Sequence, residues 1–278
     1  MTDIRIQDFG ENSKPDANND FVMTFNDNSE SKTRLRDAFY AMVPDGAPTH
    51  NNIFRGANLG ALNATHISNI QNGSFHDMFI GDYWVINGVT WRIAAFDYWY
   101  RCGDTDLTTH HVVIVPDSQL YTHVMNDTNT TTGGYVGSKM YTEGLEQAKT
   151  IIKEAFGEAN ILIHREYLTN ATTNGYASAG AWYDSEVDLM NENMVYGSAV
   201  FRPQNSLGAT IPNSHTIDKS ILPLFQFRPD LIVSNRQWYW LRDVVNATGF
   251  AYVHNVGCTA SDNASGSSGV RPAFGIKG

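Results

Sequence analysis

An Asn-Gly pair, Asn87–Gly88, separates two short runs rich in β-branched and aromatic residues, 85–86 and 89–93. Asn-Gly favours the type I′ turn, whose twist matches that of two antiparallel strands, so this pattern is the strongest short signal of a β-hairpin. Other strand-like runs occupy residues 110–115, 161–163, 237–242, 249–253 and 269–274. We therefore expect the chain to fold largely into antiparallel β-structure.

Two stretches have helical patterns. In residues 139–157 apolar side chains recur every three or four positions, and the last residue is a glycine placed as a C-cap. A second, weaker helix is expected to begin after Asp184 as N-cap and to end at Gly197. Residues 175–180, and the chain after about residue 198, have the composition of loops. The order of strands, two helices, a long loop and three closing strands predicts an α+β fold.

The first fifty residues differ from the rest. Residues 21–25 read as a strand and 31–39 as a second strand or a short helix, and the Pro- and Gly-containing residues 44–48 break the pattern. We place a domain boundary near residue 50 and expect two domains, 1–50 and 51–278. A segment as short as the first cannot bury a core of its own, so we expect it to dock on a partner or on another subunit.

Composition excludes several classes of protein. The 278 residues include 19 basic and 29 acidic side chains, a formal charge of −10, with 42% hydrophobic and 17% charged residues. A disordered chain shows the opposite balance, and a nucleic-acid binder needs a basic face. No run of about 18 apolar residues occurs, and the first residues lack the basic and apolar regions of a signal peptide. We expect no membrane insertion.

The chain offers few residues for catalysis or metal binding. Cys102 and Cys258 could form one disulfide, but two unrelated free thiols are favoured. His110 and His111 are adjacent, so on a strand their rings point to opposite faces, which favours ordinary strand residues over a metal site. His164–Glu166 could form an acid–base cluster, although a structural, hydrogen-bonded trio is favoured. We expect no catalytic residues, no metal and no cofactor.

Two further groups have alternative interpretations. Loop carboxylates could bind calcium, but they usually only solvate a turn. They are Asp104 with Asp106, and Asp117 with Asp127. The aromatic triplets 98–100 and 238–240 could provide platforms for stacking a sugar. On a strand, however, alternate residues face inward, so core packing accounts for at least half of these six aromatic residues.

The last forty residues carry the sharpest pattern. Residues 239–243 read Tyr-Trp-Leu-Arg-Asp, and residues 269–274 read Gly-Val-Arg-Pro-Ala-Phe. These runs resemble the closing segment of C-type-lectin-fold proteins related to the formylglycine-generating and sulfatase-modifying family. Residues 79–93 and 134–141 also resemble parts of a domain common in gut-bacterial and phage proteins. The resemblance covers roughly residues 52–278 and implies a C-type lectin-like fold with mainly antiparallel sheets and two helices, preceded by a small N-terminal β module.

Within that group, the chain is most similar to phage variable proteins that a diversity-generating retroelement mutates at a C-terminal repeat. Residues 246–268 are rich in the small and polar types that such mutation produces, whereas the framing residues are bulky. The resemblance implies a variable region at about 239–274 that binds a host-surface protein or glycan. The residues expected to contact it are Asn246, Thr248, Tyr252, His254, Asn255, Thr259, Asp262, Asn263, Ser265 and Ser267. The alternative is a polar surface loop without a target.

The same resemblance implies a phage virion protein, located in a tail fibre or on the capsid surface as a head fibre. Residues 20–25 and 31–39, within the segment 1–50, resemble the β module that attaches phage fibres to the virion, which implies contacts of residues 1–50 with other virion proteins and a homotrimer. The enzymes of the family use a reactive cysteine pair, and this chain has only Cys258 in the corresponding region. No catalytic role is therefore carried over. The alternatives are a virion decoration or assembly protein and a sulfatase-modifying-like enzyme.

Overall fold

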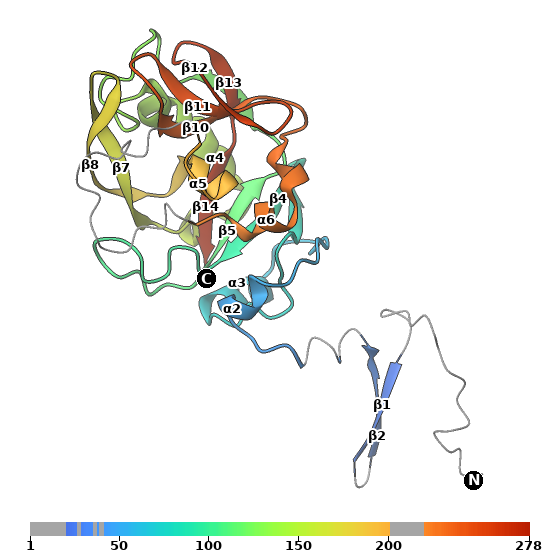
Figure 1. Ribbon diagram of the computed structural model, residues 1–278. Coiled ribbons are helices and arrows are strands. Elements are labelled where there is room, and N and C mark those ends of the chain that lie inside the picture. Colours follow the sequence, from blue (N-terminus) through green and yellow to red (C-terminus); the bar gives the residue numbers. More distant parts are fainter. Residues whose placement is uncertain (1–20, 27–28, 36–37, 39–41, 201–219) are drawn as a thin grey trace. The chain divides into compact units, whose positions relative to one another are not determined.

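The computed structural model describes residues 21–26, 29–35, 38, 42–200 and 220–278 (Figure 1). Contacts divide the chain into two compact units, residues 1–44 and 45–278. Residues 45–50, which the sequence pattern assigned to the first domain, thus belong to the second unit.

The described residues of the first unit include an antiparallel hairpin. Strand β1 (Phe21–Asn26) pairs with β2 (Ser29–Arg34) along its whole length, from Phe21 opposite Arg34 to Asn26 opposite Ser29. The first strand prediction is confirmed, and the second segment, predicted as a strand or a short helix over 31–39, is a strand over 29–34 and helical at the described residues 35 and 38.

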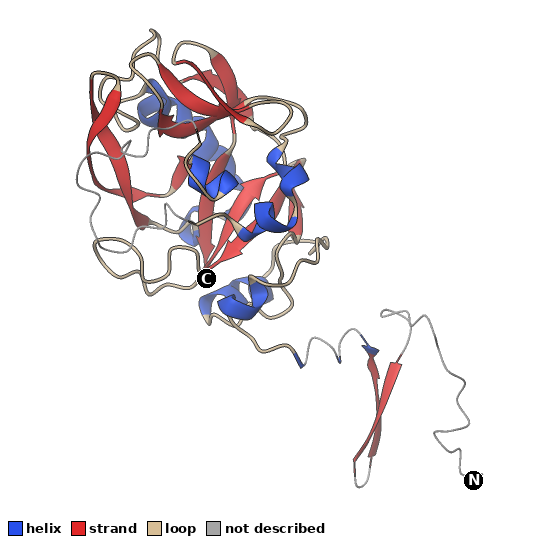
Figure 2. Ribbon diagram, in the orientation of Figure 1, coloured by secondary structure: helices blue, strands red, loops and turns tan. Residues whose placement is uncertain are grey.

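Ten of the strands in the second unit form two five-stranded sheets. The first sheet is antiparallel throughout and contains the final strand of the chain between two earlier ones. Its order is β3 (Tyr83–Ile86), β4 (Val89–Phe96), β5 (His111–Pro116), β14 (Pro272–Lys277) and β9 (Val187–Leu189). Figure 2 shows all strands of the chain in red, and the C-terminus, just after β14, lies near the lower edge of the second unit in this view.

The second sheet carries the closing part of the chain. Its order is β12 (Thr259–Asn263), β11 (Gly249–Val253), β10 (Tyr239–Val244), β13 (Ser267–Val270) and β6 (Tyr121–Val124). All its pairings are antiparallel except the single parallel bridge between Tyr239 and Gly269. The predicted α+β class with mostly antiparallel sheets and two main helices is confirmed.

The longer main helix is the predicted one. Helix α4 (Leu145–Phe156) follows a π-helical turn, η2 (Met140–Gly144), and together they cover almost all of the predicted 139–157. One face of α4 is buried because its apolar residues recur at helical spacing. Gly157 ends the helix with φ 82° before a short 3₁₀ turn, η3 (Glu158–Asn160). The other main helix, α3 (Ala64–Gln71), was not predicted.

The predicted second helix is wrong in most of its length. Strand β8 (Tyr176–Ser185) extends through Asp184, and β9 then pairs with β14. Only the short α5 (Glu192–Tyr196) is helical, with Asn191 as its N-cap. Pairing with a distant strand therefore outweighed the local helical spacing. The predicted end is right, because Gly197 has φ 78°.

Two tight hairpins use the same dipeptide. The predicted turn is confirmed, since Asn87 and Gly88 have φ 51° and 78° and join β3 to β4. Asn174 and Gly175 have φ 52° and 82° and join β7 (His164–Thr173) to β8, so the predicted loop at 175–180 is wrong. The remaining short helices are α2 (Ala47–His50), α6 (Pro223–Phe227) and the 3₁₀ turn η4 (Pro229–Ile232). Of the predicted loop after 198, residues 201–219 lie outside the described residues.

Aromatic side chains fill the core between α4 and the first sheet. The ring of Phe156 makes edge contacts with Trp91 and Phe274, with centroids 5.6 and 5.4 Å apart. Trp91 also meets Phe274 at 5.6 Å, and all three residues are buried. Such edge-to-face groups stabilise a core beyond the area they bury. The final strand is thereby anchored to the middle of the unit.

Candidate binding site

Strand β10 provides a rigid base for the candidate site. Tyr239 and Trp240 are fully buried, whereas Trp238, just before the strand, is 43% exposed. Tyr239 donates a hydrogen bond from its hydroxyl to the carbonyl of Ile232 at 3.0 Å, and Trp240 Nε1 donates to the carbonyl of His123 at 2.9 Å. Core packing thus accounts for two aromatic residues of this triplet, and the third is open to a ligand.

Arg271 ties the closing strand to its surroundings. Its guanidinium is 1% exposed and donates to three main-chain carbonyls, those of Pro116 at 2.8 Å, Leu231 at 2.9 Å and Ile232 at 3.2 Å. It also lies 5.0 Å from the ring centroid of Tyr239. A planar five-donor group suits such a fork of carbonyls, so Arg271 cross-links β5, η4 and β10.

Five of the ten predicted contact residues lie at one end of β11. Asn246, Thr248, Asn263 and Ser265 are exposed, and Asp262 is half-buried. Most of their bonds are local or reach one neighbouring loop: Asn246 Oδ1 accepts from the Thr248 amide at 2.9 Å, and the Ser265 hydroxyl donates to Asn129 at 2.6 Å. The amide of Ala264 donates to the carbonyl of Thr248 at 2.7 Å, which brings the β10–β11 and β12–β13 turns together.

Four other predicted residues lie at the opposite end of β11. His254 and Asn255 are half-buried, and Tyr252 is 9% exposed against Trp238, with ring centroids 5.7 Å apart. Burial and the nearby Asp262 and Cys258 raise the pKa of the Tyr252 hydroxyl. Thr259 is buried.

Thr259 is a structural residue rather than a surface contact. Its hydroxyl donates to Glu192 Oε1 at 2.7 Å and it is 8% exposed. Strand β11, which separates the two groups of predicted residues, has five residues and spans about 13 Å at ~3.3 Å per residue. The predicted residues therefore form two patches and not one. The tenth, Ser267, is exposed at the start of β13.

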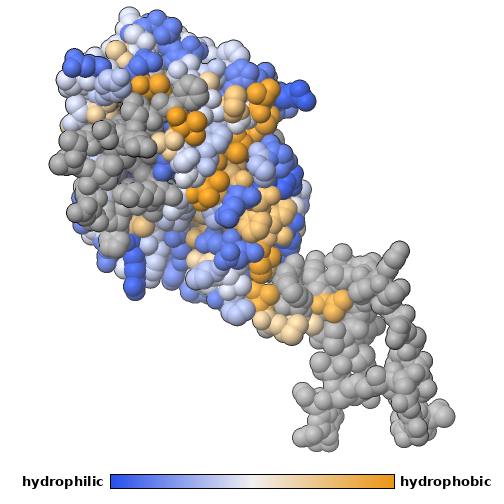
Figure 3. Space-filling view, viewed as in Figure 1, coloured by the Kyte–Doolittle hydropathy of each residue, from blue (hydrophilic) through white to orange (hydrophobic). Residues whose placement is uncertain are grey.

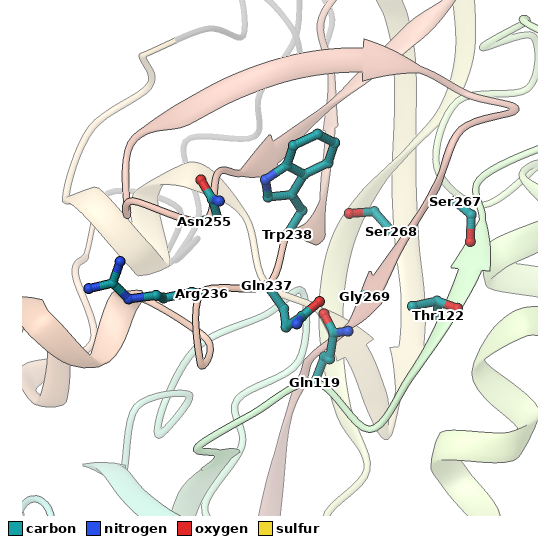
Figure 4. Close-up of a pocket in the computed structure, with 9 residues that line it drawn as sticks. All are labelled: Gln119, Thr122, Arg236, Gln237, Trp238, Asn255, Ser267, Ser268 and Gly269. Carbon is teal, nitrogen blue, oxygen red and sulfur yellow. The ribbon is translucent and has the colours of Figure 1, made fainter.

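A pocket of about 260 Å³ adjoins the second patch, which is the group of Tyr252, His254, Asn255 and Thr259 (Figure 4). It contains two of the predicted residues, Asn255 and Ser267. The other lining residues, which the sequence analysis did not select as contacts, are Gln119, Thr122, Arg236, Gln237, Trp238, Ser268 and Gly269. Two of these residues had a sequence signal, Trp238 as part of an aromatic triplet and Gly269 as the first residue of the closing motif. Gln119 and Thr122 reach the pocket through pairing of β6 with β13, which no local pattern shows.

Exposed apolar side chains are scattered over the second unit. Figure 3 shows hydrophobic residues in separate patches among hydrophilic ones on the face that Figure 1 presents. Near the second patch, Trp238 is 43% exposed and Val256, in the β11–β12 turn, is 68% exposed. Scattered single apolar residues are ordinary, and the feature that indicates a binding site here is the adjoining pocket.

The His164–Glu166 cluster is a buried structural network. His164 and Glu166 are buried, while Arg165, between them on β7, forms ion pairs with Asp104 and Asp184. Glu166 accepts from Trp99 Nε1 at 3.0 Å and from Arg242 at 3.2 Å. Burial acts to raise the pKa of Glu166, but Arg242 and the other donors lower it to about 2.

The remaining candidates also have structural partners. His111 is fully buried and its ring stacks on Trp99, and burial lowers its pKa to about 3, whereas His110 is half-exposed and bonds to Asp97 at 2.7 Å. Three of the four loop acids pair with cations: Asp104 with Arg165, Asp117 with Arg92, and Asp127 with Lys139. No three of His, Cys, Asp and Glu come together as metal ligands within the described part of the chain. Cys102 and Cys258 are free, as favoured.

No family model, curated protein or solved structure matches this chain. Within the described ranges, no helix combines the length and the apolar character needed to cross a bilayer.

Proposed function

We propose that this chain is a phage virion protein, part of a tail or head fibre, that binds a host-surface receptor through a variable, C-type lectin-like surface. The proposal is supported by the closing motifs at 239–243 and 269–274 and by the polar stretch between them. The N-terminal hairpin, β1 with β2, would attach a homotrimeric fibre to other virion proteins.

One observation carries the proposal. Within the closing segment, every residue of β10, β11 and the motif 269–274 is buried, whereas most small polar residues of the three intervening turns are exposed or half-buried. Side chains at exposed turn positions can be exchanged at small cost in stability, whereas exchange in a packed core is costly. A receptor-binding surface that changes its target needs this separation of frame and contact residues.

The composition of the turns fits the same role. Tyr, Ser, Asn and Gly form adaptable contact surfaces because they combine hydrogen-bonding groups with low conformational cost. The exposed residues of the first patch are Asn, Thr and Ser, and their bonds are mostly local. They can therefore turn to a partner without breaking a link to the core.

The test is binding of the fluorescently labelled chain to a panel of bacterial cells. In the contact variant, Thr248, Asn263, Ser265 and Ser267 become alanine. In the matched control, the exposed residues Thr173, Tyr176 and Ser178 of the β7–β8 hairpin become alanine. The contact variant is expected to lose at least tenfold in affinity for the cells, about 1.4 kcal/mol, with an unchanged melting temperature, and the control to bind as the original chain does.

Unchanged binding by the contact variant would contradict the proposal. A map of the intact virion would test the decoration role, because in that case residues 246–268 would be buried against neighbouring virion proteins. A near-copy of the last hundred or so bases beside a reverse-transcriptase gene would support the variable character of the surface.

A further inference from the structure

The pocket beside Trp238 is small and open to the surface. It is formed by residues 119–122, by the turn before β10, by the β11–β12 turn and by β13 (Figure 4). Its volume of about 260 Å³ is just below the range of about 300–1,000 Å³ typical of small-molecule sites. This space suits one small ring with its substituents and is too small for a folded protein segment.

Three buried polar atoms of the pocket lack a partner. They are Gln119 Oε1, Asn255 Oδ1 and Ser268 Oγ, none of which has a hydrogen bond among the described residues. Ser268 is only 5% exposed. Proteins pair nearly all buried polar atoms with protein groups or ordered water, so these three atoms from three segments are able to bond to a molecule bound in the pocket. Amide oxygens accept and a hydroxyl does both, so the matching ligand presents hydrogen-bond donors, as the hydroxyl groups of a sugar do.

Gly269 keeps this arrangement open. A Cβ at this position would lie 1.8 Å from Gln119 Oε1 and 2.6 Å from the carbonyl oxygen of Trp238. The Gly269 amide donates to that same carbonyl at 2.8 Å, and the Gln119 amide donates to Ser234 Oγ at 2.9 Å. The Gln119 side chain therefore lies where only a glycine leaves room, and main-chain bonds hold both sides of the pocket.

The turn before β10 carries backbone strain at the rim of the pocket. Asn235 and Arg236 have φ 47° and 57°, and the Gln237 amide donates to the Ser234 carbonyl at 2.7 Å. Two consecutive left-handed residues make the tight type I′ turn, which non-glycine residues adopt with strain. Strain of this kind clusters at ligand sites, where surrounding contacts maintain it. Here it positions Gln237 and Trp238.

Trp238 provides the flat wall of the pocket. Its ring packs against Tyr252 and His254, with centroids 5.7 and 5.3 Å away, which fixes its orientation. An aromatic face carries partial negative charge and attracts the weakly positive C–H groups on one side of a sugar ring. Among the nine described lining residues, the exposed Arg236 carries the only charge, so neither a carboxylate pair for a cation nor a buried countercharge is provided.

We infer that this pocket binds one neutral pyranose unit of a glycan without a metal ion. The sugar ring stacks on Trp238, its hydroxyls donate to the amide oxygens of Gln119 and Asn255, and Ser268 exchanges a hydrogen bond with it. The inference rests on the proposed function and deepens it, since it gives the receptor the chemistry of a neutral glycan.

The experiment uses the full chain and measures tryptophan fluorescence during titration with methyl glucoside, methyl galactoside, methyl mannoside and N-acetylglucosamine. An array of neutral and sialylated glycans extends the range, and every measurement is made with EDTA and with calcium. The variants are Trp238→Ala and Ser268→Ala, and Tyr176→Ala is the matched exposed aromatic control. Array binding, with a fluorescent label, reports on Trp238→Ala, where the intrinsic signal is altered.

We expect at least one neutral sugar to bind equally with EDTA and calcium. Each site variant is expected to weaken binding at least about tenfold, and the control to leave it unchanged. Ser268→Ala removes a hydroxyl that bonds to no described residue, so its melting temperature is expected to be unchanged, which separates lost binding from lost folding. Binding that survives Trp238→Ala, that requires calcium, or that is confined to sialylated glycans overturns the inference.

Two further outcomes separate the inference from the proposed function. If the chain adheres to bacterial cells through Thr248, Asn263, Ser265 and Ser267 but binds no saccharide, the proposed function stands and the glycan inference fails. If it binds a neutral sugar through Trp238 but adheres to no cell, the glycan site stands and the receptor-binding proposal fails.

Discussion

Replacing Arg271 with methionine tests whether the closing segment has a rigid frame. The guanidinium makes three hydrogen bonds to carbonyls of β5 and of η4, and it lies over Tyr239. Hydrogen bonds from charged donors contribute roughly 1.5–3 kcal/mol each to stability. Removing the charge also removes the cost of burying it, which offsets part of the lost stability. We expect Arg271→Met to lower the free energy of unfolding by about 3 kcal/mol.

Urea denaturation of the full chain, monitored by tryptophan fluorescence and circular dichroism, measures the free energy of unfolding, and thermal denaturation measures the melting temperature. At about 2–4 °C per kcal/mol for a unit of this size, the melting temperature is expected to fall by roughly 6–12 °C. Arg165→Met is the matched control, because this arginine also has several partners but its ion pairs with Asp104 and Asp184 are partly exposed. Such pairs contribute about 0–1 kcal/mol. Equal, small effects of the two substitutions would refute the reasoning.

Three other perturbations have expected outcomes. Arg236→Gly relieves a left-handed residue at φ 57° and is expected to raise the free energy of unfolding by up to about 1 kcal/mol in urea denaturation; a clear decrease would contradict the strain. Ionised Glu166, with a folded pKa of about 2 against an ordinary 4.5, stabilises the fold above its unfolded pKa, and this stability is lost as pH falls from about 4.5 towards 2. Glu166→Gln is expected to lower the free energy of unfolding by about 3 kcal/mol at neutral pH and to weaken its dependence on pH between about 4.5 and 2. A pH dependence equal to that of the original chain would refute this role of Glu166. Cys258 is exposed, whereas burial raises the pKa of the half-buried Cys102, so maleimide is expected to label Cys258 at least tenfold faster, as peptide mass spectrometry would show; equal rates would contradict the burial.

Short-range signals predicted the elements that short-range physics decides. The Asn87–Gly88 turn, helix α4 and strand β11 (Gly249–Val253) all depend on the preferences of neighbouring residues, and all three are found as expected. The Asn174–Gly175 turn carries the same dipeptide signal as the first hairpin and was missed. Its flanking strands contain more small and polar residues, which suggested a loop.

Long-range pairing explains the larger errors. Residues 187–194 have helical spacing, yet Val187–Leu189 is the edge strand β9 because β14 offers it a partner about eighty positions later in the chain. Nothing in the local sequence identifies that partner. The same limit applies to the pocket, where Gln119 reaches Gly269 only because β6 pairs with β13.

The exposure of the candidate contact residues was not predictable from their composition, for a related reason. Composition does not show whether a polar side chain is exposed, so the exposed Asn263 and the buried Thr259 were both predicted as contacts. The bond from Thr259 to Glu192 joins β12 to α5, which no pattern in the closing segment indicates. Trp238 was recognised as one of a triplet, but only the structure separates it from its buried neighbours Tyr239 and Trp240.

Two matched libraries test the central claim most directly, that a rigid frame carries an exchangeable binding surface. One randomises the exposed residues Thr248, Asn263, Ser265 and Ser267, and the other randomises the buried residues Trp240, Phe250, Val270 and Phe274. Each is sorted for protease resistance and then for adhesion to bacterial cells. The account predicts that most surface variants stay folded and differ in the cells they bind, while most frame variants unfold. Surface variants that unfold as often as frame variants, or that fold and all bind alike, would contradict it.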